Sequence, residues 1–147
     1  MLLTIRWTDS LSNPIYNDSL AIRKDVFIKE QHISPAIEIS DEENSYHFVI
    51  YSKENEPMAT CRLKQLDSKT FKLQRLAVRC AYRKKAIGSS LIQAIEAFSI
   101  ENGVPNIVLS AQEHALPFYL KQGYDITGHP FEEIGIPHYP LSKSLSL

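Results

Sequence analysis

Residues 71–91 read FKLQRLAVRCAYRKKAIGSSL, a pattern that combines a buried strand, a basic turn and the start of a helix. Apolar side chains between Phe71 and Val78 predict the strand, and the helix is expected to begin at Ser89. The first N–H groups of a helix lack intrahelical partners, and the helix dipole places partial positive charge at the same end. The turn at residues 83–88, RKKAIG, is therefore expected to bind an anion such as a phosphate group.

The composition is that of an ordinary soluble globular protein. The chain has 147 residues, of which 44% are hydrophobic and 22% charged, and we expect a single domain over residues 1–147. The 16 basic and 17 acidic side chains nearly cancel. This balance argues against nucleic acid as a partner, because duplex-binding proteins usually carry a basic excess. No apolar run approaches the ~20 residues that span a bilayer, so no membrane partner is expected.

The N-terminal sequence and the cysteines favour a cytoplasmic location. Residues 1–6, MLLTIR, have neither the charged start nor the long apolar core of a signal peptide. Cys61 and Cys80 show no CxxC spacing and are expected to be reduced thiols on strands. The five histidines lack the HxxxH spacing of a metal site, so no metal is expected.

The periodicity of apolar residues predicts an α/β protein with a mixed sheet. Strands are expected at residues 2–7, 46–51, 58–66, 70–79 and 107–110, followed by a hairpin of residues 124–127 with a return strand containing residues 136–139. Helices are expected at residues 13–31, 89–102 and 113–122, and residues 32–45 are expected to form a loop. The order β-α-βββ-α-β-α-ββ places helices on the faces of one sheet.

Two segments in this order resemble the signatures of the GNAT N-acetyltransferase superfamily. Residues 83–88 are similar to its acyl-CoA-binding signature, Arg/Gln-x-x-Gly-x-Gly/Ala, with Ala86 where the first glycine usually stands. Residues 115–124, ALPFYLKQGY, resemble the family's Ala-x-x-x-Tyr-x-x-x-Gly-Phe/Tyr helix. The resemblance covers nearly the whole chain, and the two ends look like the small stand-alone bacterial proteins of YjcF/ElaA-like type.

Ala86 leaves two possibilities for the backbone of the turn. If this position needs a positive φ, alanine costs roughly 1 kcal/mol relative to glycine. If φ stays negative there, alanine is harmless.

The resemblance implies the GNAT acyl-CoA N-acyltransferase fold and acetyl-CoA as co-substrate. In that fold the strands at residues 70–79 and 107–110 run parallel and then splay apart, and the arm of CoA lies in the gap. The residues that the resemblance assigns to acetyl-CoA are Ala77, Val78, Arg79, Arg83, Lys84, Lys85, Ala86, Ile87, Gly88, Ser89, Gln112, Phe118 and Tyr119.

Tyr119 is the expected catalytic residue. Family tyrosines at this spacing protonate the departing CoA thiolate, and a phenol with a pKa near 10 can donate that proton late in the reaction. The alternative is that Tyr119 is an ordinary buried aromatic on the core face of its helix. The resemblance also implies a backbone N–H near Ala77 or Val78 as the donor to the oxyanion.

The general base is left open by the sequence. Gln74 stands where relatives often have Glu, and an amide cannot accept a proton. The candidates elsewhere are His138, His47, Glu42 and Asp41. A chain of water molecules, or loss of the amine's proton before binding, would also serve.

These observations predict an N-acetyltransferase that transfers an acetyl group to a primary amine of a small molecule or peptide by direct attack. The acceptor is expected to contact Arg23, Phe27, Gln74 and His138, and the acidic segment 38–43 either attracts a cationic amine or is simply solvated. The main alternative is a catalytically silent CoA-binding sensor or interaction module, which Gln74 and Ala86 motivate. Acetylation of a protein lysine or N-terminus is a third possibility. We expect a monomer or a homodimer.

Overall fold

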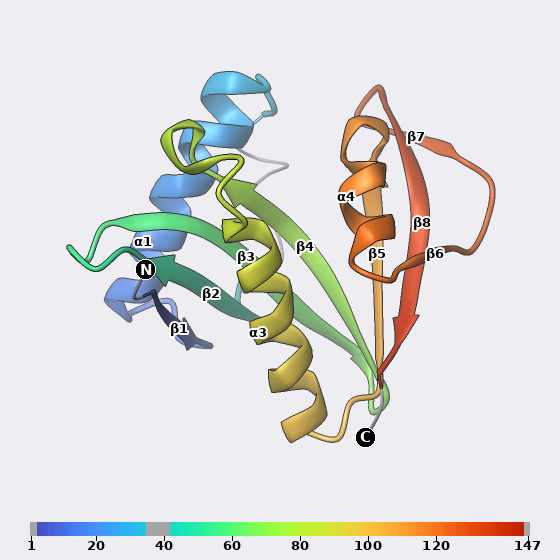
Figure 1. Ribbon diagram of the computed structural model, residues 1–147, viewed down its shortest axis with the longest axis horizontal. Helices are drawn as coiled ribbons and strands as arrows, with labels where there is room; N and C mark the ends of the chain where they lie inside the picture. The colour runs from blue at the N-terminus through green and yellow to red at the C-terminus, as the bar shows by residue number, and fades with distance from the viewer. Residues whose placement is uncertain (1–2, 35–41, 146–147) are drawn as a thin grey trace.

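One mixed sheet of eight strands organises the chain, of which the computed structural model describes residues 3–34 and 42–145 (Figure 1). The strand order is β1-β2-β3-β4-β5-β8-β6, and β7 pairs with β8. The first half supplies β1 (Thr4–Thr8), α1 (Pro14–Arg23), the π-helix η1 (Lys24–Glu30), β2 (Ser45–Tyr51), β3 (Pro57–Asp67) and β4 (Thr70–Val78). The second half supplies η2 (Cys80–Tyr82), α3 (Ile87–Glu101), β5 (Asn106–Gln112), η3 (Glu113–Ala115), α4 (Leu116–Lys121), β6 (Asp125–Ile126), β7 (Phe131–Glu133) and β8 (Ile136–Ser144).

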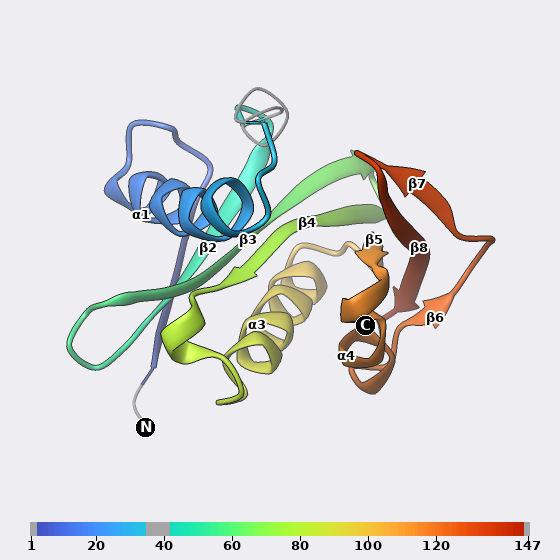
Figure 2. The same ribbon diagram turned by 90° about the horizontal axis from the view of Figure 1, so that it is seen from above.

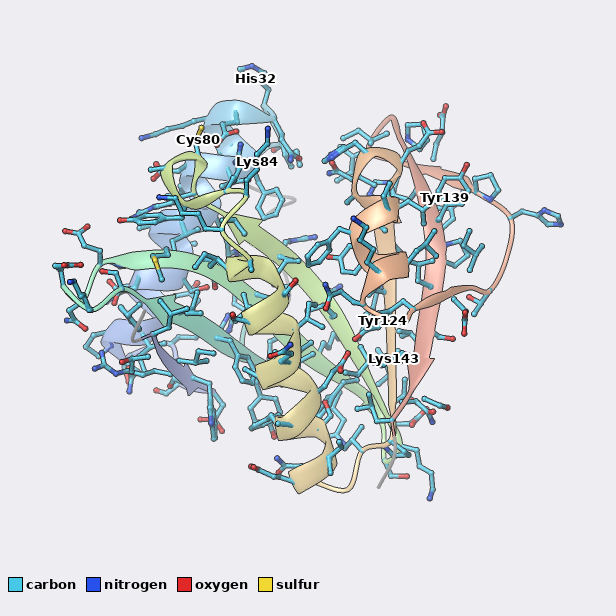
Figure 3. All side chains as sticks on the ribbon, in the orientation of Figure 1. His32, Cys80, Lys84, Tyr124, Tyr139 and Lys143 are labelled. Carbon is cyan, nitrogen blue, oxygen red and sulfur yellow. The ribbon has the colours of Figure 1, made fainter. Side chains whose placement is uncertain are left out.

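Helices cover both faces of this sheet, as expected from the sequence. Figure 2 shows α1 on one face and α3 with α4 on the other. The apolar stripe of α3 is buried against the sheet, and its members are the predicted Leu91, Ile92, Ile95 and Phe98. Lys143 on β8 donates hydrogen bonds to Glu96 of α3 and to the Gln122 carbonyl after α4, so this one side chain joins the two helices on this face to β8 (Figure 3). Within the described residues, no helix has the length and apolarity that a bilayer span requires.

The strands β4 and β5 pair over only part of their length. They run parallel and are paired from Thr70 with Asn106 to Leu73 with Leu109. Beyond these pairs β4 continues to Val78 and β5 to Gln112, and the two strands diverge (Figure 1). The sheet therefore has the gap between these strands that the sequence resemblance implied.

A β-bulge in β4 lies where the strands part. Thr60 pairs with Ala77 and Arg62 with Gln74, so two steps along β3 correspond to three along β4. The extra residue is accommodated where Arg75 adopts a φ of 58°. A bulge bends the strand that carries it and increases its twist. This bend turns the end of β4 away from β5.

Several elements differ from the sequence-based prediction. The helix expected at residues 13–31 changes from α to π geometry at Lys24, which periodicity alone does not distinguish. The helix expected at residues 113–122 begins as a 3₁₀ turn, and its α-helical part has Pro117 in the first turn, where the missing N–H is tolerated. The strand β7 was not expected because its three residues are all exposed and show no alternation. Cys80 is exposed in η2 rather than on a strand, whereas Cys61 is buried on β3.

A buried ionic cluster joins α1 to the first strands of the sheet. Glu42 pairs with Arg23 at 2.7 Å and with Arg62 at 3.2 Å. The ring of His47 bonds the Glu42 carbonyl at 3.0 Å, and burial lowers the pKa of this histidine. Arg23 is 0% exposed. The prediction that Arg23 contacts the acceptor is therefore replaced by a structural role.

We predict that Glu42→Gln destabilises the fold by about 3 kcal/mol, because it removes the carboxylate that neutralises two buried guanidinium groups. The exposed neighbour provides the matched control, since Glu43→Gln alters a solvated carboxylate and is expected to leave stability unchanged. Urea unfolding followed by circular dichroism measures both variants. Equal unfolding midpoints for the two variants would contradict the role of the cluster.

Candidate active site

Two adjoining cavities occupy the gap between β4 and β5. The larger, of about 580 Å³, is lined by η1, the end of β4 and the start of α3. The smaller, of about 150 Å³, is lined by residues of β4, β5 and β8. Gln31, Leu76 and His114 line both cavities, so the two spaces meet at these residues.

The larger cavity collects most of the residues that the sequence assigned to the coenzyme. Those that line it are Ala77, Val78, Arg83, Lys84, Ala86, Ile87, Gly88, Ser89 and Phe118. Gln112 and Tyr119 line the smaller cavity instead. Arg79 and Lys85 line neither. Arg79 is engaged elsewhere, because its guanidinium lies 3.2 Å from Asp25 and donates to the Pro57 carbonyl.

The N-terminus of α3 presents its backbone to the larger cavity. The helix begins at Ile87, two residues before the expected start, and among the described residues no side chain caps it. The N–H groups of Ile87, Gly88 and Ser89 are therefore available to a ligand. Ala86, just before the helix, has φ 60° and ψ 18°. Such a left-handed residue followed by a helical one turns successive N–H groups toward one point, which suits an anion.

The left-handed conformation decides between the two possibilities that the sequence left open at Ala86. Its φ is positive, so alanine is strained at the position where relatives usually have glycine. Lys84 also has a positive φ, of 62°, in the same turn (Figure 3). The strain at Ala86 was one of the two possibilities that the sequence left open, whereas the positive φ of Lys84 was not anticipated.

Arg83 and Glu30 form an ion pair inside the larger cavity. The Arg83 guanidinium donates to the Val78 carbonyl at 2.9 Å and lies 2.9 Å from the Glu30 carboxylate, and both side chains line the cavity. An anionic ligand in this cavity competes with Glu30 for Arg83. Glu30 was not found from the sequence, because it lies far from the signature and reaches it only through the fold.

The N–H of Val78 faces the gap. The N–H of Arg79 donates to Met58 on β3, and the N–H groups of successive strand residues point to opposite edges of the strand. Val78 therefore directs its N–H away from β3. Val78 also lines the larger cavity, so of the two residues near which the sequence places the oxyanion donor, it is the one whose N–H points into the gap.

Gly88 permits the close approach of α4 to α3. A Cβ built on Gly88 would lie 3.2 Å from the ring of Phe118, closer than carbon atoms normally pack. Next to it, the Gln122 side chain donates to the Ser89 hydroxyl at 2.8 Å. The helix that carries Tyr119 is thus positioned directly by the turn that forms the anion site.

Tyr119 is buried at the wall of the smaller cavity. It is 7% exposed, and burial raises the pKa of its hydroxyl. The phenol therefore remains protonated at neutral pH. It can donate its proton when a base forms beside it. Tyr119 lies both in the core and at the cavity wall, a position compatible with either of the two roles that the sequence considered.

Three further residues predicted to contact the acceptor, Phe27, Gln74 and His138, also line the smaller cavity. Gln74 accepts a hydrogen bond from Arg62 through its side-chain oxygen at 3.0 Å. Of the possible bases, His47 and Glu42 belong to the buried cluster described above. Asp41 lies outside the described residues. His138 is thus the one candidate from the sequence that the described residues place in this cavity.

A polar bridge crosses the junction of the two cavities. Gln112 of β5 donates to the side chain of Gln31 at 3.0 Å, and its oxygen lies 2.6 Å from the ring of His114. Gln112 was expected at the coenzyme, whereas Gln31 was missed because 81 residues separate the two glutamines. His114 was missed because no sequence motif includes it. Within the described residues, no group of three or more potential ligands could hold a metal ion.

The fold and the anion-binding turn define an acyl-CoA N-acyltransferase. The model of the GNAT acetyltransferase domain matches residues 15–145. The chain is 36% identical over 134 residues to YyaT of Bacillus subtilis, with 88% of this chain and 89% of YyaT covered. It is 34% identical over 128 residues to the N-acetyltransferase YjcF of the same organism, with 86% and 90% covered. The chain belongs to the GNAT acetyltransferase family, as an N-acetyltransferase of the expected YjcF-like type.

Solved structures agree with this assignment. A crystal structure from Lactobacillus plantarum superposes with a TM-score of 0.90 at 28% identity, covering 99% of this chain and 100% of the other. A GNAT family acetyltransferase from Elizabethkingia anophelis, solved with acetyl-CoA bound, shares the fold at a TM-score of 0.76 and 18% identity, with 97% and 98% covered. The expected GNAT fold is confirmed.

We predict that Ala86→Gly stabilises the protein by about 1 kcal/mol, because glycine adopts the left-handed conformation without the steric cost that alanine bears. Ala97→Gly, at an exposed position inside α3, is the matched control and is expected to lower stability by about 1 kcal/mol. Thermal unfolding measures the change in stability of both variants, and the two changes are expected to have opposite signs. A loss of stability in both variants would show that the turn is not strained at Ala86.

Proposed function

We propose that this protein transfers the acetyl group of acetyl-CoA to a primary amine of a small molecule or peptide by direct attack. The observation that carries the proposal is the alignment along one gap of three donors: the open N-terminus of α3, the N–H of Val78 and the hydroxyl of Tyr119. These groups suit a diphosphate, a thioester oxygen and a departing thiolate in that order. We further propose a cytoplasmic location, consistent with the free Cys61 and Cys80.

The larger cavity suits the diphosphate and pantetheine arm of the coenzyme. Backbone N–H groups of Ile87 to Ser89 would bind the diphosphate, with Arg83 and Lys84 adding positive charge. When Arg83 leaves Glu30 for a phosphate, an ion pair is exchanged rather than lost. Acetyl-CoA supplies the activated acetyl thioester at the junction of the cavities.

The residues around that junction would then perform the proton and charge steps. The N–H of Val78 would donate to the thioester oxygen as it becomes anionic. Tyr119 would give its proton to the sulfur, which keeps the leaving group neutral. The acceptor amine would occupy the smaller cavity beside Phe27, Gln74 and His138.

A second candidate function is CoA binding without catalysis, as in a sensor or interaction module. It is favoured by Gln74, whose amide accepts from Arg62 and cannot act as a base. Incubation with acetyl-CoA and a broad panel of amines, followed by detection of free thiol, separates the two. Thiol release that depends on an amine supports the transferase, and tight CoA binding without release across the panel supports the module. Acetylation of a protein lysine or N-terminus would appear as acetylated protein when the enzyme acts on a cell lysate.

We predict that Tyr119→Phe lowers kcat by about 10²-fold while leaving the Kd for CoA unchanged, because only the proton donor is removed. Tyr139→Phe is the control, since Tyr139 lies on β8 and lines neither cavity (Figure 3). Thiol-release assays and calorimetry measure the two quantities. Unchanged turnover in Tyr119→Phe would remove Tyr119 from the mechanism.

A further inference from the structure

His138 is held rigidly at the wall of the smaller cavity. It lies on β8, paired with Gln112 of β5 on one side and with Phe131 of β7 on the other. It is 7% exposed, and its ring stacks on that of Phe131 with centroids 6.0 Å apart. Because neighbours on both sides fix the residue, its ring nitrogens have defined roles.

The hydrogen bond of His138 assigns its neutral tautomer. Nδ1 lies 2.7 Å from the Ile136 carbonyl oxygen, and a carbonyl can only accept. Nδ1 therefore carries the proton. The remaining nitrogen, Nε2, has a free lone pair in the neutral ring and is the basic atom.

A carboxylate lies beside this basic nitrogen. Oε2 of Glu133 is 3.7 Å from Nε2, close enough to stabilise the ring electrostatically when Nε2 gains a proton. Glu133 is exposed on β7, so it connects the buried ring to solvent. His138 therefore lies between the cavity that it lines and an exposed carboxylate.

Three other ionisable side chains line this cavity, namely Arg75 of β4, His114 of η3 and Tyr119 of α4, and Glu133 of β7 lies beside His138 without lining it. His114 of η3 directs Nε2 at the Gln112 oxygen and is committed to the bridge between the cavities. Tyr119 of α4 stays protonated and cannot accept a proton. His114 gives its Nε2 proton to the Gln112 oxygen, so its own bare nitrogen is Nδ1. Of the two histidines, His138 is the buried one, and its bare nitrogen is the one that lies beside a carboxylate.

We propose that His138 is the general base of the transfer and that Glu133 stabilises its protonated ring and passes the proton to solvent. The inference rests on the proposed function. As the amine nitrogen bonds to the thioester carbon, one N–H proton moves to Nε2 of His138. The C–S bond then breaks, and the sulfur takes the proton of Tyr119. Glu133 passes the proton of His138 to water, and water returns one to Tyr119, so an amine and acetyl-CoA yield an N-acetylamine and CoA thiol.

The tautomer can be tested without any turnover. Long-range ¹H–¹⁵N correlation on the ¹⁵N-labelled protein at a pH where His138 is neutral separates protonated from bare ring nitrogens. We expect His138 to carry its proton on Nδ1 and to show a bare Nε2. A proton on Nε2 in the neutral ring would overturn the proposal, because the nitrogen beside Glu133 would then have no lone pair.

Kinetics test the role itself. His138→Gln is expected to lower kcat/KM by about 10²-fold, to abolish its acidic limb in the pH profile and to leave CoA affinity unchanged. Glu133→Gln is expected to lower kcat/KM while leaving CoA affinity unchanged, because the ring loses the neighbouring carboxylate that receives its proton. The exposed His129→Gln is the matched control and should behave as wild type.

The outcomes separate this inference from the proposed function. If His138→Gln turns over as fast as wild type and keeps the acidic limb of the pH profile, His138 is not the base, but the proposed transferase function still holds. Wild-type protein without turnover on any amine would overturn the proposed function, and the base with it. Rescue of His138→Gln at alkaline pH, where the amine loses its proton unaided, supports the assignment.

Discussion

The parting of β4 from β5 is the constraint on which the rest of the structure depends. The two strands share hydrogen bonds only as far as Leu73 and Leu109, and the bulge near Arg75 then bends β4 away. A continuous sheet would bury the N–H of Val78 in a ladder bond and leave no space for either cavity. Because the strands separate, a backbone donor, a helix N-terminus and a buried phenol face the same gap. The site is therefore largely made of main-chain groups, which side-chain composition does not reveal.

Distant segments complete this gap and set what enters it. From the N-terminal side, the end of η1 contributes Glu30 to the larger cavity, and the next residue, Gln31, forms the bridge with Gln112. From the C-terminal side, β7 and β8 contribute the pair of Glu133 and His138. The buried cluster around Glu42 fixes α1, which leads directly into η1, against β2 and β3. Stability and the shape of the site are thus coupled through one helix.

The sequence predicted most of the fold, because the fold depends on local patterns. Apolar runs predicted the strands from β2 to β5, and most residues of the basic turn, predicted to bind an anion, line the larger cavity at the start of α3. The π geometry of η1 and the short strand β7 escaped prediction, since the first has a helical pattern and the second has no buried face. Arg23 was predicted to contact the acceptor because the sequence around it does not indicate that it pairs with Glu42 in the fold. The basic nitrogen of His138 could not be predicted either, because its tautomer depends on the Ile136 carbonyl.

The most direct test of this account is a CoA titration of the ¹⁵N-labelled protein, followed through its backbone amide signals. If the open N-terminus of α3 and the splayed end of β4 hold the coenzyme, the amides of Val78, Gly88 and Ser89 should shift together with one half-saturation point. The same titration with pantetheine, which lacks the diphosphate, should shift the amide signal of Val78 and leave the signals of the helix amides unchanged. Shifts confined to other regions, or none at millimolar CoA, would contradict the central claim.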